Sequence, residues 1–330
     1  MAAFAEHLLL HDIRSSVADE LREMERIARD VADTAPDCVR DRMRLMLGAQ
    51  GKRVRATMLL LLARSGGDRG DRGAKAAASI ELLHLASLVH DDVIDQTGLR
   101  RGKETAHALW GNRMAVLLGD YALAKSLELV MDDPDWRVPK AISRAASLLV
   151  AGEMLELELS GKPIVLDQYR EIIAGKTAAL LEAATVCGSL IAGHDQAMVD
   201  RCGELGLHVG FGFQIIDDLL DFGIGAGDLG KAKYTDLRNG VTTLPTILYL
   251  ESAPAEKAAA MRERLAAAVS DESAIPGIVA ELESAGAFDR ARALAEDHVD
   301  RACAIVDGLP ESPSRKSLLR LIGAMTRRSF

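Results

Sequence analysis

Two long stretches of this chain are apolar on almost every side when they are read as helices, and they restrict the fold more than any other feature. The first is 74–96, apolar nearly all round from Ala76 to Val89, and the second is 197–222, which is similar from Leu205 onward. A helix that lacks a polar face is buried in a large helical core or in a membrane. The sequence therefore predicts a bundle in which other helices cover both stretches.

The composition and the remaining periodicity favour the same all-α fold class. Hydrophobic residues make up 48% of the chain but aromatic residues only 4%, and this shortage argues against a sheet. The longest polar and basic break, 223–240, directly follows the second apolar stretch, and a loop of that length is often functional. Apolar residues recur three and four positions apart in further segments, which predict helices at 14–32, 54–66, 112–131, 137–159, 176–193, 242–251, 255–269, 286–307 and 312–328.

Charge, cysteines and the N-terminal segment exclude several other classes of protein. The net charge of −9 opposes a sequence-independent grip on nucleic acid. The four cysteines form no CxxC pair and no His cluster accompanies them, as expected for thiols in a reducing compartment. The first residues lack the basic segment of a signal peptide, and no run approaches the ~18 charge-free apolar residues of a membrane span. We expect a cytoplasmic protein without stable membrane insertion.

Each of the two apolar stretches ends in three aspartates with the same spacing, which are Asp91, Asp92 and Asp95 and then Asp217, Asp218 and Asp221. Carboxylates at the negative end of a helix dipole are unfavourable, so this placement indicates function rather than stability. Two oxygen-only clusters at a shared mouth suit Mg²⁺ or Mn²⁺ better than softer metals. Because Mg²⁺ often completes its shell with substrate phosphates, the pattern predicts metal ions held between the protein and a diphosphate.

Cationic residues accompany both aspartate clusters. They are Lys52, Arg53 and Arg55 in GKRVRA, Arg100 and Arg101 after the first cluster, Lys176 in AGKTAAL, and Lys231 and Lys233 in LGKAK. The GKRVRA group lies at a predicted helix start, where free backbone N–H groups also attract anions. Arginine makes bidentate contacts with phosphate, and lysine acts as a point charge. Several separate groups of cations indicate that the protein binds two polyanionic groups rather than one.

In this order the motifs resemble those of the trans-isoprenyl diphosphate (polyprenyl) synthases of medium- and long-chain type. GKRVRA resembles the first basic motif, and HLASLVHDDVIDQTGLRRGKET resembles the first aspartate-rich motif almost completely. GKTAAL, GFGFQIIDDLLDF and LGKAKYTDLRNGVTTLP resemble the later motifs, so the match spans roughly Leu45 to Leu248. One such motif is weak evidence, whereas the ordered set is very specific.

The resemblance implies a prenyltransferase with an isoprenoid-synthase-type helical bundle around a central cavity. It implies one domain over 1–330, with a motif-bearing core at about 45–250, C-terminal helices at 255–328, and a homodimer. The implied reaction is the Mg²⁺-dependent head-to-tail (1′–4) condensation of isopentenyl diphosphate with an allylic diphosphate. It implies three metal ions when substrate is bound, with Mn²⁺ as an alternative ion.

The resemblance also assigns the site residues. The diphosphate of isopentenyl diphosphate would be held by Lys52, Arg55, His84 and Arg101. The residues on the side of the allylic diphosphate would be Arg100, Lys176, Thr177, Gln214 and Lys231. The main metal ligands would be Asp91, Asp95 and Asp217. The carboxylates that reach the metals directly or through water would be Asp92, Asp218 and Asp221.

Four positions depart from the family pattern. Gln50 stands where glycine is usual, and Ala56 stands where proline is frequent. Val241 stands where many members have a lysine on the allylic diphosphate, and Glu156 replaces a frequent glutamine. None of these changes removes a metal ligand, but the missing lysine is expected to weaken or retune binding of the allylic substrate.

Two small residues predict the length of the product. In short-chain members of the family, bulky aromatic residues four and five positions before the first aspartate plug the tunnel. Here these positions are Ser87 and Ala86, and DDVID lacks the two-residue insertion of many bacterial short-chain members. The sequence therefore predicts a product of C30 to C45 for a quinone side chain, made from farnesyl or geranylgeranyl diphosphate. The floor of the tunnel could instead be set lower, with the candidates Ile80, Leu83, Leu123 and residues near Ile142.

Three other interpretations stay open at this point. A geranylgeranyl- or farnesyl-class synthase would have the same chemistry with a shallower floor. A class I terpene cyclase shares one DDxxD cluster, but it does not need the second diphosphate site that Lys52, Arg55 and Arg101 suggest. A regulatory or partner subunit of a heteromeric synthase would be expected to lose metal ligands, whereas this chain keeps all six aspartates.

Overall fold

The computed structural model of the chain describes residues 2–48, 51–67, 71–100, 102–224 and 233–326, with side chains from residue 9 onward. Within these ranges the regular structure is helical apart from one hairpin of two-residue antiparallel strands, β1 (Leu99–Arg100) and β2 (Lys103–Glu104). The all-α fold class is therefore confirmed.

The α-helices in chain order are α1 (Ala2–Ser15), α2 (Ala18–Asp33), α3 (Asp37–Leu47), α4 (Val54–Ser65), α5 (Asp71–Ile94), α6 (Ala106–Trp110), α7 (Asn112–Glu128), α8 (Arg137–Leu159), α9 (Leu166–Ile173), α10 (Ala179–Ile191), α11 (Gln196–Asp221), α12 (Thr235–Arg238), α13 (Leu244–Ser252), α14 (Ala255–Ala268), α15 (Ile275–Ser284), α16 (Ala287–Asp307) and α17 (Pro313–Thr326). A π-helical turn, η1 (Ala174–Ala178), joins α9 to α10, and a 3-10 turn, η2 (Glu272–Ala274), precedes α15.

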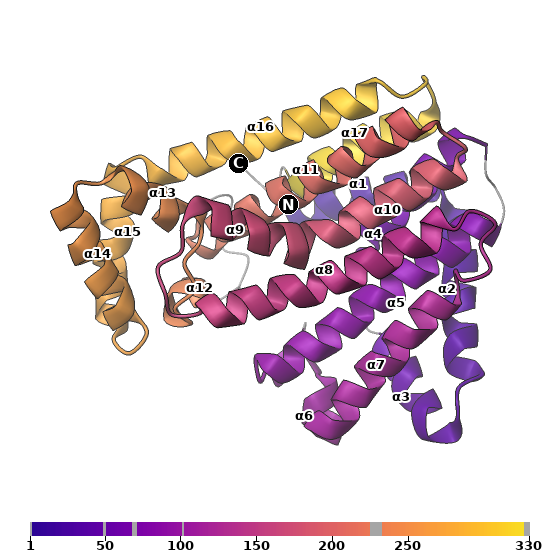
Figure 1. Ribbon diagram of the computed structural model, residues 1–330, viewed down its shortest axis with the longest axis horizontal. Coiled ribbons are helices and arrows are strands. Elements are labelled where there is room, and N and C mark those ends of the chain that lie inside the picture. Colours follow the sequence, from indigo (N-terminus) through magenta and orange to yellow (C-terminus); the bar gives the residue numbers. More distant parts are fainter. Residues whose placement is uncertain (1, 49–50, 68–70, 101, 225–232, 327–330) are drawn as a thin grey trace.

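Helix α10 lies at the centre of the bundle. It packs against α4, α5, α8 and α11, and it therefore contacts both helices that end in aspartates. In Figure 1, α8 crosses the front of the molecule, α16 runs along one edge, and α14 and α15 project at one end. Helix α16 packs along α11, and α17 packs against α4 and α16, so the C-terminal helices cover one side of the bundle.

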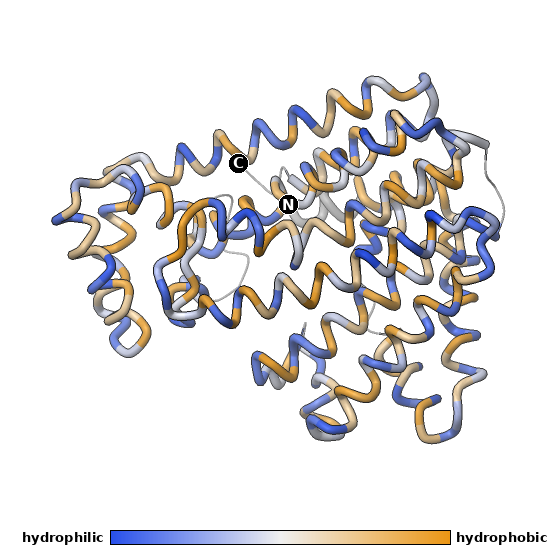
Figure 2. The backbone as a smooth tube through the Cα atoms, in the orientation of Figure 1, coloured by the Kyte–Doolittle hydropathy of each residue, from blue (hydrophilic) through white to orange (hydrophobic). Residues whose placement is uncertain are grey.

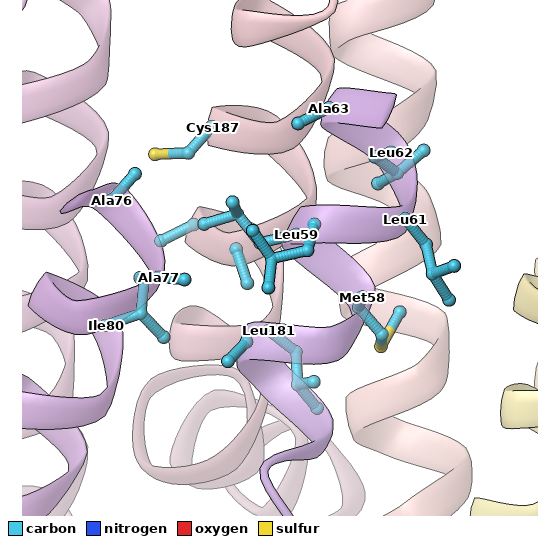
Figure 3. Close-up of a cluster of buried hydrophobic side chains, with 14 of the residues drawn as sticks. Met58, Leu59, Leu61, Leu62, Ala63, Ala76, Ala77, Ile80, Leu181 and Cys187 are labelled. Atoms are coloured by element: carbon cyan, nitrogen blue, oxygen red, sulfur yellow. The ribbon is translucent and has the colours of Figure 1, made fainter. Parts of the chain in front are cut away.

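The largest hydrophobic cluster joins α4, α5 and α10, as Figure 3 shows. Leu59 and Leu62 of α4, Ile80 of α5, and Leu181 and Cys187 of α10 are all buried in it. Alanines of α5 lie at the same contact, and their small side chains let the three helices approach closely. Because burial of each large side chain contributes about 2 kcal/mol, this cluster fixes α5 relative to α10.

Helix α16 has the amphipathic pattern of an outer helix. Hydrophilic and hydrophobic residues alternate along it in Figure 2, and its buried positions include Phe288, Ala291, Ala295, Ala302 and Val306. A second hydrophobic cluster forms where this face meets the later half of α11, together with α9 and α13 to α15. This cluster supports the C-terminal end of α11 and, with it, the second set of aspartates.

Both all-apolar stretches are buried helices, as predicted, and they are α5 and α11. The helix predicted at 14–32 corresponds to α2 and is wrong at its start, because the chain turns at Ser16 and Val17 and α2 begins at Ala18. Helices α3, α6, α9, α12 and α15 were not predicted, and neither was α1 apart from its last two residues. Helix α15 begins Ile-Pro-Gly, which reads as a break, although proline is tolerated in the first turn of a helix.

One continuous helical segment is long and apolar enough to cross a membrane. It is Leu166–Ile191, which combines α9, η1 and α10, and 72% of its apolar window is buried inside the protein. No other helix in the described part of the chain meets that standard. The apolar character of this segment follows from its central place in the bundle, so it is the core helix of a soluble protein.

Candidate active site

The first aspartate cluster, at the end of α5, contains one bonded carboxylate and two unbonded ones. Asp92 is buried, and its Oδ1 accepts a hydrogen bond from Nε of Arg100 at 2.8 Å. Arg100 lies in β1, so this ion pair holds the hairpin against the end of the helix. Asp91 is half-buried and Asp95 is exposed, and neither side chain forms a hydrogen bond or an ion pair with another described residue.

Asp218 of α11 is the most deeply buried carboxylate of the second cluster, with 2% of its surface exposed. Its Oδ2 accepts hydrogen bonds from Oη of Tyr169 at 2.7 Å and from the backbone N of Leu244 at 3.3 Å. Its Oδ1 accepts one from Nε2 of Gln214 at 3.0 Å, and Oε1 of Gln214 accepts one from Oγ1 of Thr177 at 2.8 Å. These bonds join α9, η1, α11 and the start of α13 at one point.

Asp221 has a different role, because its carboxylate caps the short helix α12. Its Oδ1 and Oδ2 accept hydrogen bonds from the backbone N–H groups of Thr235 at 3.0 Å and Asp236 at 3.2 Å. A carboxylate at a helix N-terminus is favoured by the free N–H groups there. The remaining member of the cluster, Asp217, is half-buried and forms no hydrogen bond or ion pair with the described residues.

The carboxylates without a hydrogen bond or ion pair to a described residue are therefore Asp91, Asp95 and Asp217, the three that the resemblance assigns to metal ions. Among the residues that the structure describes, no three His, Cys, Asp or Glu side chains come close enough to hold a metal ion by themselves. Unbonded and separated oxygen donors suit a hard divalent ion whose other ligands are water and a substrate diphosphate. The donor set thus fits Mg²⁺ bound together with a diphosphate.

Lys176 lies within electrostatic reach of Asp91 and lines the same cavity as Asp218. It lies in the π-helical turn η1, and its Nζ forms ion pairs with Glu153 at 3.0 Å and with Glu156, both on α8. Two glycines permit this close contact, since a Cβ on Gly152 would lie 2.7 Å from the backbone N of Lys176 and one on Gly175 would lie 2.9 Å from Cα of Gly152. Turns of the π type are frequent at functional sites.

Carboxylates crowd around Lys176 from both sides. Burial and Glu153 raise the pKa of Asp91 to about 7, although Lys176 opposes the shift. Burial and the nearby Asp221 raise the pKa of Asp236 to about 7. Burial lowers the pKa of Lys176, but the two glutamates on α8 raise it by more, so the amine stays charged. The site thus carries an excess of negative charge, which divalent cations would relieve.

A cavity of about 210 Å³ lies beside Lys176, between the end of α8, α9, η1, α11 and the loop that precedes α13. Gln214, Asp218 and Asp236 form part of its polar wall. Val241 and Glu156, two departures from the family pattern, also line it. Both changes make the wall more negative than it would be with the lysine and glutamine found in many members of the family.

The basic residues of GKRVRA lie at the N-terminus of α4, which packs against α5. Nη1 of Arg55 lies 3.2 Å from Nε2 of His84, so two predicted ligands of one diphosphate are brought together. Lys52 is exposed just before the helix. Arg53 is the N-cap of α4 and has left-handed backbone angles (φ 52°, ψ 35°), which cost a non-glycine residue roughly 1–2 kcal/mol. Its Nη1 pairs with Oε2 of the buried Glu81 at 2.7 Å.

The structure separates the two residues that were predicted to set the product length. Ser87 is half-buried and lies one turn before Asp91 on the same face of α5. Ala86 instead belongs to a cluster with Leu118 of α7 and with residues of α2 and α3. Leu83 lies deeper in the main core, with 3% of its surface exposed. Ser87 is therefore better placed than Ala86 to narrow a path that leads down α5 from the aspartates.

Three positions that the sequence singles out lie outside the described residues, and they are Gln50, Arg101 and Lys231. The site also contains residues whose role the sequence did not reveal, chiefly Glu153, Tyr169 and Asp236. Glu153 interrupts an apolar helix and Asp236 lies in the long polar break, so both left a visible signal. Tyr169 left none, because its helix α9 was not predicted.

A helical bundle in which two helices end in aspartate clusters near a partly buried lysine is typical of enzymes of the isoprenoid synthase class. The sequence model of the polyprenyl synthetase family matches residues 36–282. The chain belongs to this family, and it is a trans-polyprenyl diphosphate synthase, a prenyltransferase. This result confirms the resemblance and excludes the terpene cyclase.

Three relatives illustrate the match. All-trans-nonaprenyl-diphosphate synthase (geranyl-diphosphate specific) of Rhodobacter capsulatus is 35% identical over 312 residues, which cover 94% of this chain and 95% of that protein. A decaprenyl diphosphate synthase from Rhodobacter capsulatus has a crystal structure similar to this one, with a TM-score of 0.91 at 30% identity over 97% of this chain and 99% of that one. The crystal structure of a polyprenyl synthase from Caulobacter crescentus, complexed with calcium and isoprenyl diphosphate, is also similar. Its TM-score is 0.85 at 32% identity, and the match covers 97% of this chain and 98% of that one. Enzymes of the family depend on divalent metal ions.

We predict that Asp217 and Asp218 differ in their effect on stability. Asp218→Ala removes the acceptor of three hydrogen bonds and leaves the Tyr169 hydroxyl and the Leu244 N–H without it, so the free energy of unfolding should fall by about 2–4 kcal/mol. Asp217→Ala breaks no bond among the described residues and should change it by less than about 0.5 kcal/mol. Urea unfolding in EDTA, followed by circular dichroism, measures the free energy of unfolding of both variants. Equal losses of stability would contradict the predicted difference between Asp217 and Asp218.

Proposed function

We propose that this synthase binds Mg²⁺, or Mn²⁺ as an alternative, through Asp91, Asp95 and Asp217, with three ions in the substrate complex. The observation that carries the proposal is the division of the six aspartates, since the other three already accept hydrogen bonds from the protein. Those three hold the shape of the site and reach the metals directly or through water. When bound, Mg²⁺ would neutralise the charge that develops on the leaving diphosphate.

The allylic diphosphate is bound by Arg100, Lys176, Thr177, Gln214 and Lys231. Support comes from the cavity beside Lys176, whose wall contains both Lys176 and Gln214. Lys176 now pairs with two glutamates, and it would exchange them for phosphate oxygens when substrate enters. Since Val241 supplies no charge at this wall, binding of the allylic substrate depends more strongly on metal ions than it would with a lysine there.

The diphosphate of isopentenyl diphosphate is bound by Lys52, Arg55, His84 and Arg101. Arg55 and His84 are adjacent at 3.2 Å, which supports a shared ligand. They lie where α4 begins, and the free N–H groups of a helix start also attract anions. Two diphosphates are thereby held on opposite sides of the reacting carbons.

The reaction proceeds by ionisation and then addition. The C1–O bond of the allylic diphosphate breaks, and diphosphate leaves with the electron pair. C4 of isopentenyl diphosphate attacks the allylic C1 with its double bond, and a proton from C2 passes to the released diphosphate. The protein fixes both diphosphates and keeps water away with apolar walls, because water would capture the allylic cation. This sequence requires no nucleophilic side chain.

The product is a C30 to C45 prenyl diphosphate for a quinone side chain, made from farnesyl or geranylgeranyl diphosphate as primer. The small side chain of Ser87 supports a long product, because it leaves space one turn below Asp91. The similarity to relatives named as nonaprenyl and decaprenyl synthases also favours a long product over a geranylgeranyl- or farnesyl-class product. Leu83 and Ile80 lie buried below Ser87, so a growing chain must move these side chains or pass beside them.

Elongation in vitro tests this function. Purified protein is incubated with Mg²⁺, isopentenyl diphosphate and, in turn, geranyl, farnesyl and geranylgeranyl diphosphate, and mass spectrometry reads the product. We expect C30 to C45 products, none with EDTA, and recovery when Mg²⁺ is added. Asp91→Ala and Asp217→Ala should be inactive with unchanged helical content. A C20 product would favour the short-chain alternative. If no primer were elongated, the partner-subunit alternative would be favoured. Turnover that resists EDTA would exclude the metal mechanism.

The substitution Ser87→Phe should shorten the product by at least two isoprene units, because an aromatic ring one turn below Asp91 blocks the path down α5. Ala86→Phe is the matched control, with the same ring one residue earlier and directed at Leu118 of α7. Overpacking there should cost about 1–3 kcal/mol of stability and change product length less. Mass spectrometry and urea unfolding separate the two effects. A product shortened only by Ala86→Phe would place the path beside α7.

We also propose that residues 1–330 form one domain and that the protein is a cytoplasmic homodimer. An exposed apolar group on the adjacent helices α7 and α8 supports the dimer, and it comprises Val116, Leu117, Val150, Met154 and Leu157. Contiguous apolar surface on a soluble protein marks an interaction site. Light scattering should give the mass of two chains, and Leu117→Glu should give a monomer. A wild-type protein with the mass of one chain would contradict the proposal.

A further inference from the structure

The buried carboxylate of Glu81 on α5 makes two contacts with the start of α4 and also acts electrostatically on Arg55. Its Oε2 pairs with Nη1 of Arg53 at 2.7 Å, and only 7% of the Glu81 side chain and 12% of the Arg53 side chain are exposed. Its Oε1 lies 3.4 Å from the backbone N of Ala56, in the first turn of α4. Burial lowers the pKa of Arg55, and the charge of Glu81 opposes that shift.

The backbone at Arg53 explains why such an anchor is needed. Arg53 has left-handed angles (φ 52°, ψ 35°), which a residue with a side chain adopts only when its surroundings enforce them. As the N-cap of α4 it supplies no side-chain acceptor for the helix N–H groups. Glu81, on the neighbouring helix α5, holds the side chain of Arg53 through an ion pair. It also accepts a hydrogen bond from a backbone N–H group in the first turn of α4.

The effect of this anchor reaches the ligands on either side of Arg53. Lys52 precedes the left-handed residue and Arg55 follows it by two positions, so the turn at Arg53 sets the direction of one relative to the other. His84 lies one turn after Glu81 on the same face of α5 and contacts Arg55 at 3.2 Å. One face of α5 thus fixes both arginines of GKRVRA.

We propose that Glu81 is a positioning residue for the isopentenyl diphosphate site, which enforces the left-handed turn at Arg53 and so presents Lys52 and Arg55 as one preformed anion-binding pair. The proposal rests on the assignment of Lys52, Arg55 and His84 to that diphosphate. Glu81 itself does not touch the substrate, because an anion beside a diphosphate would be repelled. Its contribution is to the geometry of the cations, and its loss should weaken binding of one substrate selectively.

Steady-state kinetics of Glu81→Gln, with each substrate varied in turn, test the proposal. The exchange keeps the shape of the side chain and removes its charge. We expect the KM for isopentenyl diphosphate to rise about tenfold, with kcat and the KM for the allylic substrate changed less than about twofold. Glu20→Gln is the matched control, since Glu20 pairs with Arg64 at the other end of α4 at 3.0 Å. It should leave both KM values unchanged.

A purely structural role would lower the thermal midpoint of Glu81→Gln and of Glu20→Gln alike without a selective change in KM, and that result would overturn the proposal. Lys52→Ala and Arg55→Ala are measured alongside. If they leave the KM for isopentenyl diphosphate unchanged, the assignment of the site is wrong. If they raise it and Glu81→Gln does not, only the role of Glu81 is wrong.

Variants of Arg53 test the left-handed turn itself and need no change at Glu81. Both Arg53→Gly and Arg53→Ala remove the ion pair, but only glycine adopts left-handed angles without strain. Arg53→Gly should therefore keep the KM for isopentenyl diphosphate within about threefold of wild type, whereas Arg53→Ala should raise it about tenfold. The double variant Glu81→Gln with Arg53→Gly should recover most of the loss caused by Glu81→Gln. Equal KM values for the glycine and alanine variants would overturn the proposal.

Discussion

Repulsion among carboxylates at the ends of α5 and α11 governs the structure around them. Each helix ends in three aspartates, and their charges crowd a space that is partly shielded from water. A different interaction stabilises each of three aspartates. Arg100 forms an ion pair with Asp92, three donors form hydrogen bonds with Asp218, and Asp221 accepts hydrogen bonds from the N-terminus of α12. An arginine shortly after the first cluster thus holds the hairpin against the end of α5.

The acidic end and the basic end of the site each contain one residue of the opposite charge. At the acidic end the partly buried cation Lys176 lies among carboxylates, and at the basic end the buried anion Glu81 lies among cations. Each of these charges has the sign opposite to that of the residues around it, and each forms ion pairs with its neighbours. A buried charge that loses its partner is costly, so such residues fix geometry more strongly than surface pairs do.

The sequence was sufficient for the fold class and for the two buried helices, because periodicity and ordered motifs are local signals. The resemblance separated Asp217, as a main metal ligand, from Asp218, but it did not reveal that Asp218 is buried and accepts a hydrogen bond from Tyr169. Nor did it separate Ser87 from Ala86, which are adjacent in sequence but face different helices. These differences depend on which helix covers each face, and that information comes from long-range packing.

The π-turn η1 has a consequence for the phase of the helix that contains it. A turn with one extra residue rotates everything before it by about 100° relative to everything after it. The apolar positions of α9 and those of α10 therefore lie on faces that are rotated relative to each other. A single helical wheel cannot represent both helices. This rotation lets Tyr169 reach Asp218 while α10 keeps its apolar face toward α4. A relative shorter by one residue at this turn would need a different donor for its buried aspartate.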